Sequence, residues 1–146
     1  MFYLGMGPRK GEDGKYTITF PMGNKKLSGI AAEDIGKCAY GIFKRGKELI
    51  GKTVGIAGDQ LACNEMARIL TKTLGKEVSY HEITPEQYRN LGFPGADDLG
   101  NMFQFYRIFE DVFDRTRDVR FSKELDPELK SFEKWATENA ELMPVD

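Results

Sequence analysis

The sequence predicts an α/β fold, because short segments rich in β-branched and aromatic residues alternate along the chain with amphipathic segments of helical period. Residues 15–20 read KYTITF, and their near-alternation of apolar and polar side chains is typical of a strand. Residues 33–44 carry apolar side chains at intervals of three and four, the spacing of one helix face. With 146 residues and 40% apolar content, the chain is expected to form a single domain with a substantial core over residues 1–146.

The remaining elements of the first half follow in chain order. The inward face of the helix at 33–44 is predicted to hold Ile35, Cys38, Ala39, Ile42 and Phe43, and Gly46 suits its C-terminal end. A short extended segment is expected at 26–30 and a strand at 53–57. Asp59 is a suitable N-cap for a helix that runs to Leu74 and ends at Gly75, with an apolar stripe of Cys63, Met66, Ala67, Leu70 and Leu74.

The second half is predicted to be mostly helical. A strand at 78–82 leads to Thr84–Gln87, which form a capping box with Pro85 at the first helical position. Gly92 ends that short helix, and a longer one begins near Asp97 and Asp98. Its apolar positions continue to residue 113, residues 114–127 are expected to be irregular, and a final helix is expected over 127–142. That helix would face inward through Leu129, Phe132, Trp135 and Ala136.

Composition excludes several function classes. The net charge is −2, so the chain lacks the basic character of a nucleic-acid-binding protein. No apolar run approaches the roughly 20 residues that cross a bilayer, so we expect neither nucleic acid nor membrane among direct partners. Two cysteines are too few for a disulfide framework, and Cys38 and Cys63 both lie on apolar helix faces. We therefore expect buried thiols in a reducing compartment, the cytoplasm with access to the nucleus.

Four local patterns are reminiscent of catalytic or phosphate-binding motifs, and each has a simpler structural interpretation. Tyr40 and Lys44 have the Y-x-x-x-K spacing of a dehydrogenase acid and its lysine, but chance pairs at this spacing are frequent. The glycines of 55–60 and of 5–11 fit no complete phosphate loop. The lone His81 has no cysteine cluster with which to bind zinc. We therefore predict no catalytic residue and no metal ligand in this chain.

Several segments, taken together in their order and spacing, resemble the C-terminal part of the NmrA-like proteins, which are atypical short-chain dehydrogenase/reductases. The residues that carry the resemblance are Asp13–Lys15, Phe20–Gly23, Glu33–Gly36, Thr53–Gly58, Thr84–Tyr106, Phe132 and Trp135. The resemblance implies the C-terminal portion of an extended Rossmann architecture, a few strands plus a small helical substrate domain. The family's N-terminal Rossmann domain, which holds NADP on a Gly-rich loop, is expected to be absent from this chain.

The resemblance also implies where ligands would lie. In the family, the loop before the positions of Phe2 and Tyr3 touches the nicotinamide, so these two residues are the nearest here to an upstream cofactor site. NADP would be the cofactor of the parent family, and we expect this chain alone to bind none. The apolar cluster around Met102, Phe103 and Tyr106 is open to three interpretations: core, the wall of a substrate pocket, or an interface, with Phe93 at the mouth of an interdomain cleft for a small molecule.

Three functions fit these features. The first is the C-terminal part of an NADP-sensing redox regulator that interacts with other proteins, as many family members do in transcriptional regulation. The second is the substrate domain of an NAD(P)H-dependent reductase of small quinone- or ketone-like substrates. The third is an autonomous protein-interaction module. Because strand edges and an apolar helix face would be left uncovered without the Rossmann sheet, we expect protein partners or self-association.

Overall fold

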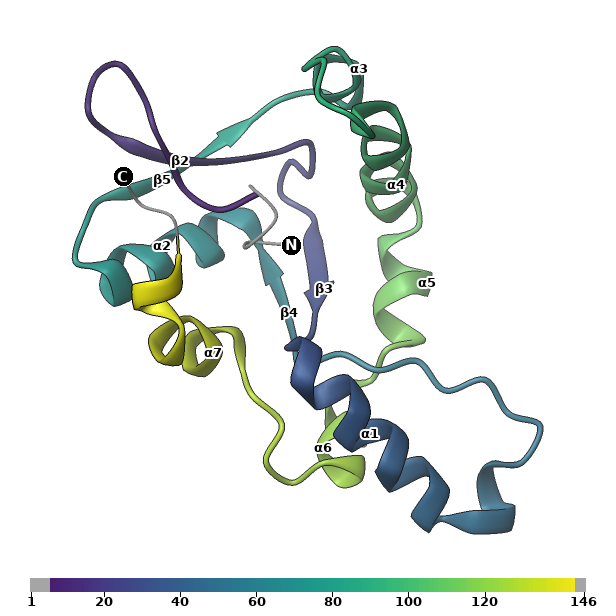
Figure 1. Ribbon diagram of the computed structural model, residues 1–146. Coiled ribbons are helices and arrows are strands. Elements are labelled where there is room, and N and C mark those ends of the chain that lie inside the picture. Colours follow the sequence, from purple (N-terminus) through teal and green to yellow (C-terminus); the bar gives the residue numbers. More distant parts are fainter. Residues whose placement is uncertain (1–5, 144–146) are drawn as a thin grey trace.

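The protein has an α/β fold, seen in a computed structural model that describes residues 6–143 (Figure 1). Helices flank two small sheets. The elements in chain order are β1 Arg9–Lys10, β2 Tyr16–Phe20, β3 Lys26–Gly29, α1 Ala32–Lys44, the 3₁₀ turn η2 Gly46–Leu49, β4 Asp59–Ala62, α2 Cys63–Leu74, β5 Val78–Glu82, α3 Pro85–Arg89, α4 Ala96–Ile108, α5 Glu110–Arg115, α6 Val119–Leu125, α7 Phe132–Glu138 and the 3₁₀ turn η3 Ala140–Leu142.

The first sheet has the strand order β1-β2-β5, and β2 and β5 run parallel. Their register pairs Tyr16 with Val78 and Phe20 with Glu82. Alternate side chains of β2 point into the core, so Tyr16, Ile18 and Phe20 are buried, as the alternating pattern predicts. Helix α2 packs against this sheet, and α7 packs on α2 (Figure 1).

The second sheet pairs β3 with β4 antiparallel, and here two sequence predictions were wrong. Residues 53–57 form no strand, and Asp59 does not start a helix. The strand lies instead at Asp59–Ala62, because this segment hydrogen-bonds to β3 and because the Gly58 amide donates to the Gly29 carbonyl at 2.7 Å. Helix α2 then begins at Cys63, and the Glu65 carboxylate accepts the Ala62 amide proton at 2.8 Å.

The main core lies between the first sheet, α2, α4 and α7. The stripe predicted for α2 is confirmed for Cys63, Met66, Ala67 and Leu70, which are buried, and Gly75 ends the helix in the left-handed region. The capping box of α3 is also confirmed, since Thr84 and Gln87 exchange backbone-to-side-chain hydrogen bonds of 3.1 and 2.8 Å. In the centre of this core, Phe103 of α4 is completely buried.

A smaller apolar cluster joins α1 to α6. Its buried members are Cys38, Leu125 and Leu129. Two predictions failed in this region: residues 119–125 form α6, although 114–127 were expected to be irregular, and the last helix begins at Phe132 rather than at 127. Asp118 starts α6 because its carboxylate accepts the Arg120 amide proton at 2.8 Å, and the apolar pattern gives no sign of this cap.

The buried face of α1 agrees with the predicted one only in part, since Cys38 is buried and Ile42 packs against its cluster as predicted. Asp34, Cys38 and Gly41 are buried, whereas Ile35 and Phe43 are exposed. The reason is the absence of a side chain at Gly41, which allows the backbone of Leu125 to lie directly against the helix. The close approach of α6, rather than the apolar periodicity of α1, therefore sets the orientation of α1. Among residues 6–143, no helix has the length and apolar character needed to cross a membrane.

Candidate functional site

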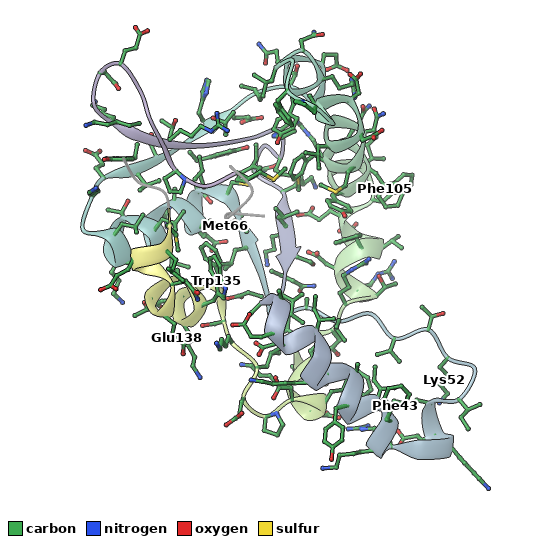
Figure 2. All side chains as sticks on the ribbon, viewed as in Figure 1. Phe43, Lys52, Met66, Phe105, Trp135 and Glu138 are labelled. Atoms are coloured by element: carbon green, nitrogen blue, oxygen red, sulfur yellow. The ribbon has the colours of Figure 1, made fainter. Side chains whose placement is uncertain are left out.

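A cavity of about 350 Å³ opens between β3, the beginning of α1, α4 and the segment that leads into α7. Its wall is mainly apolar and aromatic. The residues that line it are Leu27, Ser28, Gly29, Ile30, Ala31, Ala32, Glu33, Asp59, Leu61, Met66, Met102, Phe103, Tyr106, Lys130, Ser131, Phe132 and Trp135. Figure 2 labels Met66 and Trp135, which come from α2 and α7 and lie near one another.

Two of the aromatic walls are built by ring packing. On one side, Phe103 meets Phe20 edge-on at 5.5 Å between ring centroids and meets Tyr106 at 6.5 Å. On the other side, Phe132 and Trp135 stack at 6.1 Å with an interplanar angle of 22°. Flat aromatic walls of this kind suit a small, flat, apolar molecule.

Most polar groups of the wall already form hydrogen bonds or ion pairs with other residues of this chain. Asp59 accepts the Phe132 amide proton at 3.1 Å, and Ser131 accepts that of Lys134 at 3.2 Å. The Lys130 ammonium donates to Glu33 at 2.8 Å and lies 2.6 Å from Glu138. These carboxylates raise the pKa of Lys130, with Glu138 the larger cause, so it stays charged at neutral pH.

Tyr106 differs from these groups. Its ring packs on Phe113 at 4.2 Å, but within residues 6–143 its hydroxyl has no hydrogen-bond partner. A phenol in an apolar wall is a donor that a bound carbonyl or hydroxyl could use. It is therefore the one side chain of this wall with an uncommitted hydrogen-bonding group suited to ligand recognition.

Of the four residues singled out from sequence, Met102, Phe103 and Tyr106 line this cavity and Phe93 does not. Phe93 lies beside Tyr88, with ring centroids 5.8 Å apart. Phe2 and Tyr3 fall outside the described residues. No sequence pattern links Leu27, Met66 and Lys130 to a site. For Lys130 the sequence carries no signal, because its partner Glu33 lies 97 residues away and Glu138 follows at no recognisable motif spacing.

The other motifs have structural roles. The Lys44 ammonium lies over the Tyr40 ring at 5.5 Å on an exposed part of α1, as expected for a surface pair. Cys38 and Cys63 are both buried, as predicted, and burial raises the pKa of the Cys63 thiol to about 12. His81 lies exposed on β5. Among the described residues, no group of three or more histidine, cysteine or acidic side chains is placed to hold a metal ion.

The glycines of residues 55–60 do not fit a pyrophosphate. The Gly58 amide, which a phosphate loop would offer to its ligand, is taken by the Gly29 carbonyl. A Cβ atom at Gly55 would meet the backbone of Thr116, and one at Gly58 would meet that of Lys130. These glycines are therefore required for close packing of the loop, and residues 55–60 offer no cofactor site.

The fold matches part of solved Rossmann-type structures. NmrA, a negative transcriptional regulator solved in complex with NAD, superposes with a TM-score of 0.70 at 17% identity, over 94% of this chain and 46% of that one. The Citrobacter sp. triphenylmethane reductase, solved with NADP(H), superposes with a TM-score of 0.67 at 16% identity, over 85% of this chain and 44% of that one.

The sequence itself identifies the family. The model of the NmrA-like family matches residues 3–136, and the chain belongs to that family. Prestalk A differentiation protein A of Dictyostelium discoideum is 30% identical over 130 residues, which cover 84% of this chain and 42% of that protein. The chain thus spans less than half the length of these relatives.

Proposed function

We propose that this chain supplies the effector- and partner-binding part of an NmrA-like, NADP-sensing redox regulator. The observation that carries the proposal is the cavity, whose wall is apolar and aromatic while its charged groups are bound to one another or to backbone amides. Such a wall recognises a small flat molecule by burial and provides little for proton transfer. NmrA, which shares the fold, is described as a negative transcriptional regulator and was solved with NAD and with NADP.

The cofactor would be held on a segment upstream of the region that this chain matches. In the family the Gly-rich loop precedes the region that this chain matches, and residues 55–60 offer no substitute for it. We therefore expect NADPH to leave the melting temperature of this chain unchanged. If NADPH did bind, a concentration of about 100 times its dissociation constant would add roughly 2.7 kcal/mol to the stability of the fold. For a chain of this size, that would raise the melting temperature by about 5–10 °C.

One observation favours a second candidate, the substrate domain of an NAD(P)H-dependent reductase of small quinone- or ketone-like substrates. The uncommitted Tyr106 hydroxyl in the cavity wall could donate a hydrogen bond to a substrate carbonyl. The Citrobacter sp. triphenylmethane reductase, which shares the fold, was solved with NADP(H).

A single set of assays separates the two. The chain and its Tyr106→Phe variant are each mixed with small quinones and ketones and with flat apolar compounds that lack a carbonyl, and their thermal melts are followed. The regulator predicts a rise in melting temperature with flat apolar compounds that Tyr106→Phe leaves unchanged. A rise that only quinones and ketones produce and that Tyr106→Phe abolishes, while the variant without ligand melts normally, would replace the regulator with the reductase. If no such compound shifted the melting temperature, the cavity would not be a binding site for small flat molecules, and the proposal would be contradicted.

A further inference from the structure

The outer face of α1 is a helix-long apolar surface that nothing covers within residues 6–143. Two large side chains on it, Phe43 and Tyr40, are 81% and 65% exposed, and Ile35 is 48% exposed. Between them lie Ala32, Gly36 and Ala39, at intervals of four and three, so they form one stripe that continues to Phe43. A Cβ atom at Gly36 would meet no heavy atom within 4 Å. In Figure 1, α1 projects from the rest of the molecule toward the lower right.

The two ends of this face carry opposite charge. At the N-terminal end, two lysines share four carboxylates: Lys37 pairs with Asp34 and Glu128, and Lys130 pairs with Glu33 and Glu138. This end therefore carries an excess of two negative charges. The Glu128 side chain is 80% exposed, so the excess reaches the surface.

At the C-terminal end the balance is reversed. Arg45 is bound by Glu48 at 3.4 Å and by Glu124 at 2.9 Å, so the nearby acids are occupied. Within the described part of the chain, Lys44, Lys47 and Lys52 take part in no ion pair. Figure 2 shows Phe43 and Lys52 at this end of the molecule. Counted together with Arg45 and its two acids, this end therefore carries an excess of two positive charges near the exposed phenylalanine.

We propose that α1 is a self-association surface on which the α1 of a second copy lies antiparallel. A two-fold contact requires a surface that complements itself, and this one does so in both charge and shape. If residue 33 lies opposite residue 44 of the other copy, the centre falls between residues 38 and 39. Phe43 then lies over the turn that contains Ala32 and Gly36 of the other copy, and small residues there allow the two helices to approach closely.

The same register aligns the charges. Glu33 and Lys44 lie on one edge of α1, because their separation of eleven residues is close to three helical turns. A two-fold axis perpendicular to both helices keeps that edge on the same side in each copy. The lysine-rich end of one copy therefore meets the carboxylate-rich end of the other at two equivalent places.

The test is sedimentation velocity over about a hundredfold range of protein concentration, at low and high salt, since a complex held by charged ends depends on both. Gly36→Leu should abolish the dimer, because it fills the approach groove at a position where a Cβ atom meets nothing in the monomer. Lys44→Glu with Lys47→Glu should weaken dimerisation at least about tenfold, because it places like charges opposite one another. The matched control is Lys10→Glu with Lys15→Glu, which changes the net charge equally at exposed positions elsewhere and should leave dimerisation unchanged.

A charge exchange tests the antiparallel orientation. Glu33→Lys with Glu128→Lys should also be monomeric, because both ends of α1 are then positive. Mixed with the Lys44→Glu, Lys47→Glu variant, it should form a one-to-one heterodimer, since each end again meets its opposite. Thermal melts establish that each variant is folded before it is mixed. A chain that stays monomeric at every concentration overturns the proposal, as does a dimer that survives Gly36→Leu or variants that do not recombine.

Discussion

Gly41 and Gly36 provide a matched pair of substitutions that tests how α1 is oriented. Both glycines lie within the same helix, and replacing either with alanine should favour the helix by roughly 0.5–1 kcal/mol. At Gly36 the new methyl group meets nothing within 4 Å, so Gly36→Ala should raise the free energy of unfolding by that amount.

At Gly41 the same methyl group would overlap the carbonyl and Cα atoms of Leu125. These are backbone atoms, so the clash cannot be relieved by rotating a side chain, and α6 must move away from α1. Overpacking of this kind costs about 1–3 kcal/mol. After subtraction of the helix-propensity gain, we expect Gly41→Ala to lower the free energy of unfolding by up to about 2 kcal/mol.

The assay is urea unfolding followed by circular dichroism at low protein concentration, where self-association does not contribute. The two variants should shift the midpoint in opposite directions with unchanged m-values. If Gly41→Ala proved as stable as Gly36→Ala, contact between α1 and the Leu125 backbone would not be what orients the helix, and the reasoning would fail.

Three further predictions concern caps, thiols and the lysine bridge. Thr84→Ala should lower the free energy of unfolding by about 1 kcal/mol, measured by urea unfolding, because the Gln87 amide loses its hydroxyl acceptor; Thr84→Ser, which keeps that oxygen, is the control. Neither Cys38 nor Cys63 should react with a thiol reagent at pH 8 in the folded chain, whereas both should react in urea; burial raises both thiol pKa values, and fast labelling of the native chain would contradict the fold there. Because the pKa of Lys130 is raised in the fold, its ion pairs with Glu33 and Glu138 stabilise the fold fully below the ordinary lysine pKa, and this stability is lost as pH rises through the folded-state pKa. Lys130→Met should therefore remove part of the stability loss seen in strongly alkaline solution. An alkaline unfolding profile identical to that of the unchanged chain would contradict the bridge.

The sequence predicts elements well where local chemistry decides them. The strand at β2 follows from alternation, the start of α3 from the Thr84–Gln87 box, and the end of α2 from Gly75. Each of these signals is contained within a few neighbouring residues. The apolar pattern that begins near Asp97 and continues to residue 113 also predicts a helix, which the structure divides between α4 and α5 at Phe109.

The errors arise where distant contacts override local pattern. Residues 53–57 have the composition of a strand, but the segment that finds a partner is Asp59–Ala62, which hydrogen-bonds to β3. Similarly, Ile35 and Phe43 have the spacing of a core face, yet both are exposed, because the helix packs through Gly41 against the Leu125 backbone. Periodicity identifies that a helix has an apolar face, but here only part of that face is buried: Cys38 and Ile42 pack inward, while Ile35 and Phe43 are exposed.

The cavity depends on two carboxylates whose role no local pattern could reveal. Asp34 of α1 accepts the Lys130 amide proton at 2.8 Å across 96 residues, and Asp59 of β4 accepts that of Phe132 across 73 residues. Because these bonds hold the backbone immediately before α7, they fix where Phe132 and Trp135 stand relative to Phe103. Asp34 is fully buried, and carboxylates buried in this way are costly unless they accept hydrogen bonds. Asp59, which the sequence predicts as a helix cap, and Asp34, which lies on the buried face of α1, thus both position the aromatic wall of the site.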